Sequence, residues 1–226
     1  MRTDDPVPQT PDVYDHYTSA FTRPWDDLIL QRVVEEWRKM GRSHGTLLDV
    51  GTGTAVLLVM AARRPELDGL KLLGLDYFDS MVAKARASVA GQGLADRIEI
   101  LQADAQSTGL PDGCAHLIMS RATIHHVRNP SEAYQEMYRL LAPGGVAVVH
   151  DMRRDPAPEA LAEFEELRAR AGIKPTILEQ KYTVEETRKQ LQDAGLEYAS
   201  SVAWGKSGAA ALGFEVRLER REGHSG

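Results

Sequence analysis

Short apolar runs and amphipathic stretches alternate along the middle of the chain. The apolar runs have the length of buried strands and are bounded by glycine, proline and polar residues. They predict strands over residues 46–50, 70–75, 97–101, 115–119 and 146–150. The stretches between them carry apolar residues at helical spacing and predict helices over residues 54–63, 80–90 and 131–141. Strands that alternate with helices in this way are typical of a parallel sheet covered on both faces.

The two ends of the chain follow different patterns. Residues 1–12 are rich in Pro, Asp and Thr and predict a flexible tail, whereas apolar residues recur from Trp25 to Trp37 with the period of an amphipathic helix. In the C-terminal part, helices are predicted over residues 159–171 and 184–194, and β-like runs over residues 196–204 and 211–218. The two runs are consecutive and a short Gly-rich loop joins them, which favours an antiparallel hairpin at the sheet edge.

We therefore predict the α/β class: a Rossmann-like, doubly wound and mostly parallel seven-stranded sheet, with a C-terminal antiparallel hairpin and helices on both faces. The sequence contains neither a repeat nor a linker, so residues 1–226 are predicted to form a single domain. Within it we expect an N-terminal tail and cap helix over residues 1–44, followed by the strand-and-helix core over residues 45–151.

Composition and charge restrict the kinds of molecule that the protein is expected to bind. The chain has 42% hydrophobic and 27% charged residues, as globular proteins do. A net charge of -6 disfavours a nucleic-acid partner, because such proteins usually present a basic face. The single cysteine, Cys114, cannot form an intramolecular disulfide, and no apolar segment resembles a signal-peptide core or a membrane span. We therefore expect a cytoplasmic protein that binds neither nucleic acid nor membrane.

A glycine turn lies between the first predicted strand and the following helix. Gly51 and Gly53 flank Thr52, and glycine allows both a positive φ and close approach of the backbone to a ligand. An ordinary strand-to-helix turn is the alternative interpretation of a bare Gly-x-Gly. Val56 occupies the place of the third glycine of the dinucleotide fingerprint, which argues against a nicotinamide or flavin dinucleotide.

Three acidic residues follow or end successive predicted strands. Asp49 precedes the glycine turn, where a carboxylate attracts a cation and repels a pyrophosphate. Asp76 ends the second strand at a distance from the turn that suits a ribose-binding acid, and Asp104 follows the third strand. Each alone is a common cap or turn residue. Together they favour a nucleoside ligand that carries positive charge and no phosphate.

Four segments in order resemble the motifs of the class I S-adenosylmethionine-dependent methyltransferases, specifically the branch that acts on small molecules of the natural-product type. Residues 48–54 match the glycine motif of that superfamily, and residues 74–76 match its ribose-binding acid. Residues 103–105 match the segment that meets the adenine, and residues 141–145 match the turn before the fifth strand. The resemblance covers approximately residues 45–151, which are then the cofactor-binding core.

The resemblance implies S-adenosyl-L-methionine as the cofactor. It implies that the glycines underlie the methionine part, that the acid of the second strand holds the ribose, and that the segment after the third strand holds the adenine. Ala55 stands where many relatives have glycine. The cofactor-binding residues expected on this basis are Tyr17, Asp49, Gly51, Thr52, Gly53, Asp76, Tyr77, Met81, Asp104, Ala105, Ser120 and Arg121.

Methyl transfer from a sulfonium is an in-line displacement, so its main requirement is a well-positioned acceptor. A base helps when the acceptor must lose a proton, and histidine has a suitable pKa. His125 and His126 follow the fourth strand and Asp151 ends the fifth, where it can orient a histidine. These three are the candidate catalytic residues; alternatively, both histidines only support the loop. Adjacent histidines lack the spacing of a helical metal-ligand pair, so no metal is expected.

The segment over residues 152–182 has apolar residues without a clear period and is predicted to form part of a substrate lid. The expected function is methyl transfer to N, O or C of a small metabolite in natural-product biosynthesis, with heteroaromatic, indole-type acceptors among the candidates. The alternatives are a cofactor-binding protein without transfer activity and an RNA or protein methyltransferase. A homodimer is compatible with the sequence.

Overall fold

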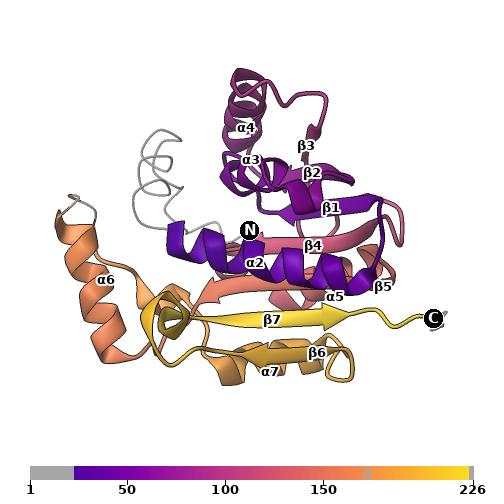
Figure 1. The fold of residues 1–226 in the computed structure, drawn as a ribbon. Coiled ribbons are helices and arrows are strands. Elements are labelled where there is room, and N and C mark those ends of the chain that lie inside the picture. The colour runs from indigo at the N-terminus through magenta and orange to yellow at the C-terminus, as the bar shows by residue number, and fades with distance from the viewer. Residues whose placement is uncertain (1–22, 171, 173, 224–226) are drawn as a thin grey trace.

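The computed structural model describes residues 23–170, 172 and 174–223. They form a seven-stranded sheet in the order β3-β2-β1-β4-β5-β7-β6 (Figure 1). The strands are β1 (Gly45–Val50), β2 (Leu70–Asp76), β3 (Ile98–Gln102), β4 (Ala115–Arg121), β5 (Leu141–Met152), β6 (Ser200–Ala203) and β7 (Gly213–Glu219). β1 to β5 pair in parallel, and β7 pairs antiparallel with both β5 and β6. The predicted fold class, including the C-terminal antiparallel hairpin, is confirmed.

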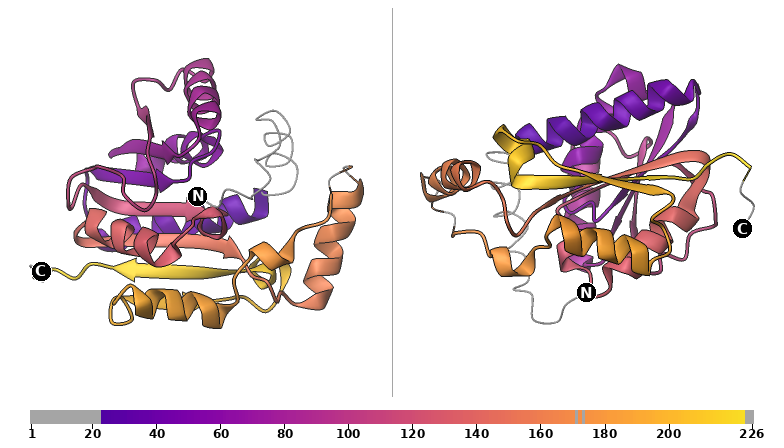
Figure 2. Two further views of the ribbon diagram at one scale, coloured as in Figure 1. Left: turned by 180° about the vertical axis from the view of Figure 1, so that it is seen from behind. Right: turned by 90° about the horizontal axis from the view of Figure 1, so that it is seen from below.

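Helices cover both faces of this sheet, as Figure 2 shows. The helices are α2 (Arg23–Met40), α3 (Val56–Ala62), α4 (Asp79–Gly91), α5 (Pro130–Leu140), α6 (Pro158–Arg170) and α7 (Val184–Asp193), with short 3-10 turns at Pro65–Leu67, Ile124–His126, Leu178–Gln180 and Gly208–Leu212. Among the described residues, no helix combines the length and the apolar character needed to cross a lipid bilayer.

The two hydrophobic cores follow from the alternation of side chains along each strand. In β1, Leu47 packs with α2, α3 and α4 on one face, while Leu48 packs with α5 and α7 on the other. The same alternation separates Leu117 from Ile118 in β4. A strand that is buried on both faces reads as a continuous apolar run, which is why the sequence pattern located these strands.

Two strand boundaries differ by more than two residues from the predicted ones. β5 begins at Leu141, directly after α5, instead of after a turn over residues 143–145. Gly144 takes a φ of +75° and its N–H donates to the Arg220 carbonyl at 2.7 Å, so the chain stays in the sheet through the glycines. The predicted strand over residues 196–204 shrinks to Ser200–Ala203, because Leu196 buries its side chain in a turn that closes the end of α7.

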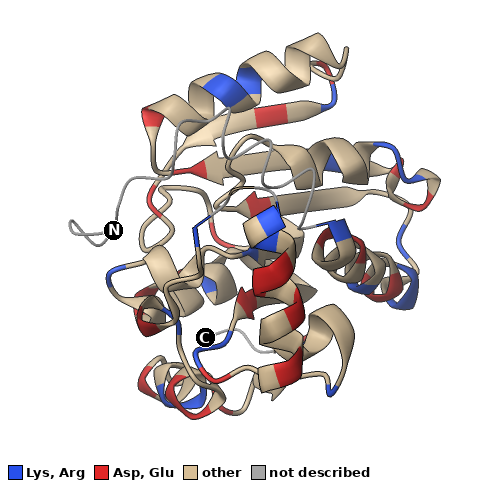
Figure 3. Ribbon diagram, turned by 90° about the vertical axis from the view of Figure 1, so that its left-hand side faces the viewer, with Lys and Arg blue, Asp and Glu red and all other residues tan. Residues whose placement is uncertain are grey.

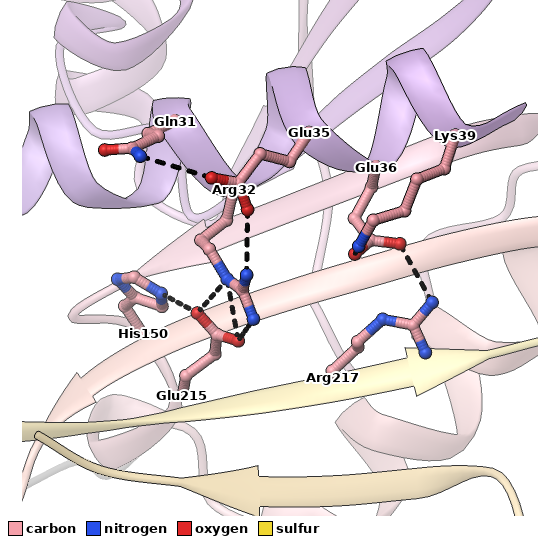
Figure 4. Close-up of polar contacts among 8 residues, drawn as sticks. All are labelled: Gln31, Arg32, Glu35, Glu36, Lys39, His150, Glu215 and Arg217. Carbon is pink, nitrogen blue, oxygen red and sulfur yellow. Dashed lines mark hydrogen bonds and ion pairs between the residues drawn. The ribbon is translucent and has the colours of Figure 1, made fainter. Parts of the chain in front are cut away.

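Helix α2 is held on the sheet by two clusters of ion pairs, which Figure 4 shows. In the first cluster, Arg32 lies 2.9 Å from a carboxylate oxygen of Glu215 on β7, and the Nε2 atom of His150 on β5 lies 2.9 Å from the other oxygen. In the second cluster, the Arg217 guanidinium lies 2.8 Å from the buried Glu36 carboxylate. Both clusters join residues far apart in the sequence, so they fix the position of α2 across the sheet.

The first cluster makes a pH-dependent contribution to stability. Burial acts to raise the pKa of Glu215, but the hydrogen bonds from His150 and Arg32 outweigh it and lower the pKa to about 2. A carboxylate with a lowered pKa stabilises the folded state above its unfolded pKa of about 4.3, and this stabilisation is lost as the pH falls toward the folded pKa.

We therefore expect Glu215→Gln to lower the free energy of unfolding by about 2 kcal/mol at neutral pH. The difference between the variant and the wild type should shrink as the pH falls from about 5 toward 2. Urea unfolding at a series of pH values measures it. The control is Glu35→Gln, which removes the more exposed carboxylate beside Arg32 and should have a smaller effect. A difference that does not change with pH would contradict the assignment.

Candidate functional site

A cleft opens at the carboxyl ends of the parallel strands, where the order β3-β2-β1-β4 brings four strand ends side by side. It holds about 730 Å³ of space, including its opening to solvent, which is within the usual range for ligand sites. Its lining residues are Val50, Gly51, Gly53, Leu75, Asp76, Tyr77, Phe78, Met81, Ala103, Asp104, Ala105, Arg121, Ala122, Thr123, His126 and Val127.

The glycine turn after β1 forms the floor of this cleft. The N–H groups of Gly51 and Thr52 both donate to the Leu75 carbonyl at 2.8 Å, which ties the turn to the end of β2. Gly51 has a φ of +75°, and a Cβ atom at this position would lie 2.2 Å from Thr123 Oγ1. Glycine is therefore required at Gly51 both by the backbone conformation and by the close side chain of Thr123.

The departure from the glycine motif at Ala55 has a structural consequence. Ala55 precedes the first residue of α3 and takes a φ of +67°, a left-handed conformation that glycine adopts without strain. For an alanine this conformation costs about 1 kcal/mol. The turn at Ala55 therefore has the backbone conformation that is typical of glycine. The Ala55 side chain is buried, so its methyl group fills space in the core.

Asp76 joins the glycine turn to the start of α4. Its Oδ2 atom accepts a hydrogen bond from the Gly53 N–H at 2.9 Å, and its Oδ1 atom accepts one from the Phe78 N–H at 3.0 Å. Burial raises the pKa of Asp76, and the backbone hydrogen bonds act in the opposite direction. Each carboxylate oxygen has room for a further hydrogen bond, so Asp76 can still accept from a ligand hydroxyl.

The side of the cleft formed by β2 and β3 combines an aromatic pair, a methionine and a carboxylate. Tyr77 is 46% exposed and packs edge-on against Phe78, with ring centroids 5.5 Å apart. Met81 also lines the cleft and is buried. Asp104 accepts a hydrogen bond from the Gln106 N–H at 3.0 Å, which fixes its carboxylate at the rim beside Ala105. Such a surface suits a flat apolar ring that has polar edges.

Three residues predicted for the site lie behind its wall and do not line it: Asp49, Thr52 and Ser120. Asp49 is 1% exposed and accepts a hydrogen bond from Thr52 Oγ1 at 2.8 Å. Burial is the main cause that raises the pKa of Asp49 to about 7. The Ser120 hydroxyl donates to the Val50 carbonyl at 2.8 Å, which joins the ends of β1 and β4. In this structure all three side chains support the glycine turn.

The β4 side of the cleft carries the cationic and imidazole groups. The Nε atom of Arg121 lies 2.7 Å from the Asp26 carboxylate, on the first turns of α2, and both side chains are largely buried. Ala122 has a φ of +54°, an uncommon value for a residue other than glycine, at the point where the chain leaves β4 for the site. The half-buried His126 follows and lines the cleft.

The two adjacent histidines occupy different environments. His125 is only 4% exposed, and its Nδ1 atom lies 2.7 Å from Asp151 Oδ1 at the end of β5. The Asp151 carboxylate also accepts the His125 backbone N–H, and the His125 imidazole ring lies 3.9 Å from the His126 ring between centroids. Burial acts to raise the pKa of Asp151, but the His125 side chain and its hydrogen bonds lower it to about 2. Asp151 and His125 therefore form a buried pair that supports His126.

Several site residues were not found from the sequence. Phe78, Thr123 and Val127 line the cleft, but as ordinary apolar or turn residues they carry no distinct sequence signal. In the sequence, Asp26 is an acidic residue in the first turn of a helix. Such residues are common there, because their negative charge interacts favourably with the helix dipole. Only its 1% exposure and its contact with Arg121 indicate a further role.

Other predicted features lie outside the cleft. Tyr17 is not among the described residues, and no residue of the predicted lid over 152–182 is among the described lining residues. Tyr182 instead pairs with Arg153 in an isolated β-bridge and packs beside the second core. Within the described ranges, no group of three or more His, Cys, Asp or Glu side chains is arranged to hold a metal ion.

This combination of fold and site defines a nucleoside-binding α/β protein, and comparisons with known proteins identify its family. The family profile described as "Methyltransferase domain" matches residues 48–149. A phosphatidylethanolamine N-methyltransferase of Cereibacter sphaeroides is 30% identical over 150 residues, which cover 62% of this chain and 71% of that protein. A ubiquinone/menaquinone biosynthesis C-methyltransferase of Marinomonas sp. is 28% identical over 167 residues, which are 71% of this chain and 65% of that protein.

Solved structures share the fold across nearly the whole chain. A putative S-adenosyl-L-methionine-dependent methyltransferase of Methanococcus maripaludis superposes with a TM-score of 0.71 at 20% identity, covering 95% of this chain and 94% of that one. A SAM-dependent methyltransferase of Aquifex aeolicus gives a TM-score of 0.65 at 21% identity, covering 93% and 98%. The chain belongs to the class I S-adenosylmethionine-dependent methyltransferase superfamily. S-adenosyl-L-methionine is accordingly its cofactor.

We expect Asp76→Asn to weaken binding of S-adenosylhomocysteine, the demethylated cofactor, by about tenfold or more. The amide nitrogen of asparagine cannot accept the hydrogen bonds that the lost carboxylate oxygen accepts, from the backbone or from a ribose hydroxyl. Isothermal titration calorimetry measures the dissociation constant. The control is Glu99→Gln on the neighbouring strand, whose exposed carboxylate pairs with Lys71 outside the cleft. Unchanged affinity in Asp76→Asn would exclude Asp76 from cofactor binding.

Proposed function

We propose that the protein transfers the methyl group of S-adenosylmethionine to a nitrogen, oxygen or carbon atom of a small metabolite, of the natural-product type. Heteroaromatic acceptors of the indole type belong to this class. The observation that carries the proposal is that His126 lines the same cleft as Asp76, from the opposite side of the glycine turn. A candidate proton acceptor and a candidate cofactor anchor thus share one space.

The residues of the cleft fit the cofactor. In our proposal Asp76 accepts hydrogen bonds from the ribose, Tyr77 and Met81 contact the adenine, and Asp104 with Ala105 meets its polar edge. Gly51 and Gly53 allow the methionine part to approach the backbone, and Asp49, Thr52 and Ser120 keep the turn in place. When bound, the cofactor supplies an electrophilic methyl group on a positively charged sulfur.

His126 is the residue that we propose to act on the acceptor. Its imidazole can take a proton from an acceptor N–H or O–H as the methyl group is transferred. Asp151 holds the His125 ring through Nδ1, and the His125 ring packs against that of His126. His125 and Asp151 therefore act as positioning residues, which restrict the orientations available to His126. The protein contributes mainly orientation, the largest requirement of an in-line displacement.

A small acceptor is supported by the charge distribution. Figure 3 views the side of the molecule at which the parallel strands end, and there Lys and Arg positions of the described residues are mixed with Asp and Glu positions. A nucleic-acid substrate favours a continuous basic surface. The relatives support the same proposal, because one is named for N-methylation of phosphatidylethanolamine and the other for C-methylation in ubiquinone and menaquinone biosynthesis, and neither name refers to a nucleic acid or a protein substrate. Residues 152–182 are the proposed substrate lid. A cytoplasmic location and a homodimer are further predictions.

The proposal predicts turnover with at least one small acceptor. A screen with methyl-labelled cofactor should include indoles, phenols, amines, quinone precursors and phosphatidylethanolamine, with labelled product separated by chromatography. Transfer to a small compound supports the proposal. Binding of the cofactor without transfer to any acceptor would favour the alternative of a binding protein, and transfer only to RNA or protein would favour the other alternative.

With an acceptor in hand, His126→Ala should lower kcat by about 100-fold, the usual contribution of a general base, while cofactor affinity changes little. Asp151→Asn should lower kcat less, because it only loosens the support of His126. His44→Ala, on an exposed loop, is the matched control. Wild-type rates in both site variants would make the histidines structural.

A further inference from the structure

The two edge strands of the described sheet differ in their protection against pairing with another chain. The strand order begins with β3 and ends with β6, and β6 pairs with β7 alone in this sheet. Edge strands usually carry a charged residue or a proline that prevents further pairing. β3 carries the exposed Glu99, whereas β6 has the sequence Ser-Ser-Val-Ala, with neither a charge nor a proline. β6 is therefore open to a further strand.

The pairing of β6 with β7 determines which residues of β6 face the free edge (Figure 1). The Glu219 N–H donates to the Ala199 carbonyl at 2.9 Å, directly before β6 begins. Hydrogen-bonded positions alternate along an antiparallel pair, so Ser201 also bonds to β7. Ser200 and Val202 consequently direct their backbone N–H and C=O groups away from β7. Both ends of this short strand thus offer donors and acceptors to a neighbour.

Exposed aromatic side chains flank β6 at both ends. Tyr198 is 59% exposed and Trp204 is 46% exposed. The Tyr198 ring packs edge-on against that of Tyr138, with centroids 6.4 Å apart. The guanidinium carbons of Arg188 and Arg153 lie 5.4 Å and 5.8 Å from the centroid of the Trp204 ring. Tyrosine, tryptophan and arginine are the residues in which protein interfaces are enriched.

The charges beyond these aromatic residues make the edge complementary to itself. Glu197 precedes Tyr198, Lys206 follows Trp204, and both charged residues are exposed. An antiparallel arrangement of two copies about a two-fold axis brings Glu197 of each copy to the end where Lys206 of the other lies. A parallel arrangement would bring like charges together, which is unfavourable. The charges therefore favour a second copy of this chain in the antiparallel orientation.

We infer that β6 pairs antiparallel with β6 of a second copy of this chain, so that the two sheets form one continuous sheet. Ser201 lies on the two-fold axis, because Ser200 of each copy can then exchange hydrogen bonds with Val202 of the other. The same register brings Tyr198 of one copy beside Trp204 of the other. The cleft lies at β3, β2, β1 and β4, away from this edge, so the inference does not rest on the proposed function.

Light scattering after size-exclusion chromatography tests whether the dimer forms. At micromolar concentration we expect the wild type to have about twice the 24.9 kDa mass of one chain. Ser200→Pro removes an N–H that faces the free edge, at the first residue of the strand, where proline is tolerated. This variant should have the mass of a single chain. A wild type with the mass of a single chain would overturn the inference.

A disulfide across the axis tests the register and does not depend on the folding of Ser200→Pro. Residues on the axis that face each other without mutual hydrogen bonds have Cα atoms about 4.5 Å apart, which suits a disulfide. In a Cys114→Ala background, Ser201→Cys should form a covalent dimer on oxidation. Ala203→Cys is the matched control, because it is also exposed but lies about 13 Å from its counterpart in the other copy. A dimer that Ser201→Cys does not cross-link, or equal cross-linking of both variants, would overturn the inferred pairing.

Discussion

The site depends on the carboxylate of Asp76, which accepts one backbone N–H from the glycine turn and another from the start of α4. The first hydrogen bond connects the turn after β1 to the end of β2, and the second fixes the chain where it enters α4. They are possible because the parallel register brings Val50 opposite Leu75, so that both strands end at the same level. A carboxylate in this place can accept a further hydrogen bond from a ligand, so one group can serve both the structure and the proposed recognition of the cofactor.

A second constraint is the burial of charge around the same strand ends. Asp26, Asp49 and Arg121 are all largely buried, and the Arg121 charge acts to lower the pKa of Asp49 against the effect of burial. Charges in such an environment interact more strongly than at the surface and must be held in place by the surrounding elements. The ion pairs that fasten α2 to β5 and β7 supply that support at a distance from the cleft. The helix that precedes the first strand therefore contacts a residue that lines the cleft.

Much of the fold was predictable because the central strands β1, β2, β4 and β5 are largely buried on both faces and their sequences are mostly apolar. The acids at the strand ends were predictable for a related reason: the residue that follows a buried run of a parallel sheet lies at the ligand-binding edge. The strand boundaries were predicted wrongly where the apolar or glycine content of a segment did not match the backbone pairing of that segment in the sheet. Leu196 is buried, yet it belongs to a turn, because its N–H donates to the Leu191 carbonyl at the end of α7. The glycines of residues 143–145 did not end the sheet, because Gly144 finds a hydrogen-bond acceptor in the C-terminal segment.

The sequence by itself indicated the class of the protein: its alternation of apolar runs and helical stretches predicted the sheet, and the glycine turn with Asp49, Asp76 and Asp104 favoured a nucleoside ligand without phosphate. The tertiary structure decided which residues face the cleft. His125 and His126 are equivalent in sequence, but the buried carboxylate of Asp151 draws the first into the core and leaves the second on the surface of the cleft. Asp49 and Arg121 were both expected at the cofactor site, but Asp49 is buried outside the lining, whereas Arg121 lines the cleft. The physical reason is that the direction of a side chain at a strand end depends on its partners across the fold, and those partners lie on elements that local sequence does not connect.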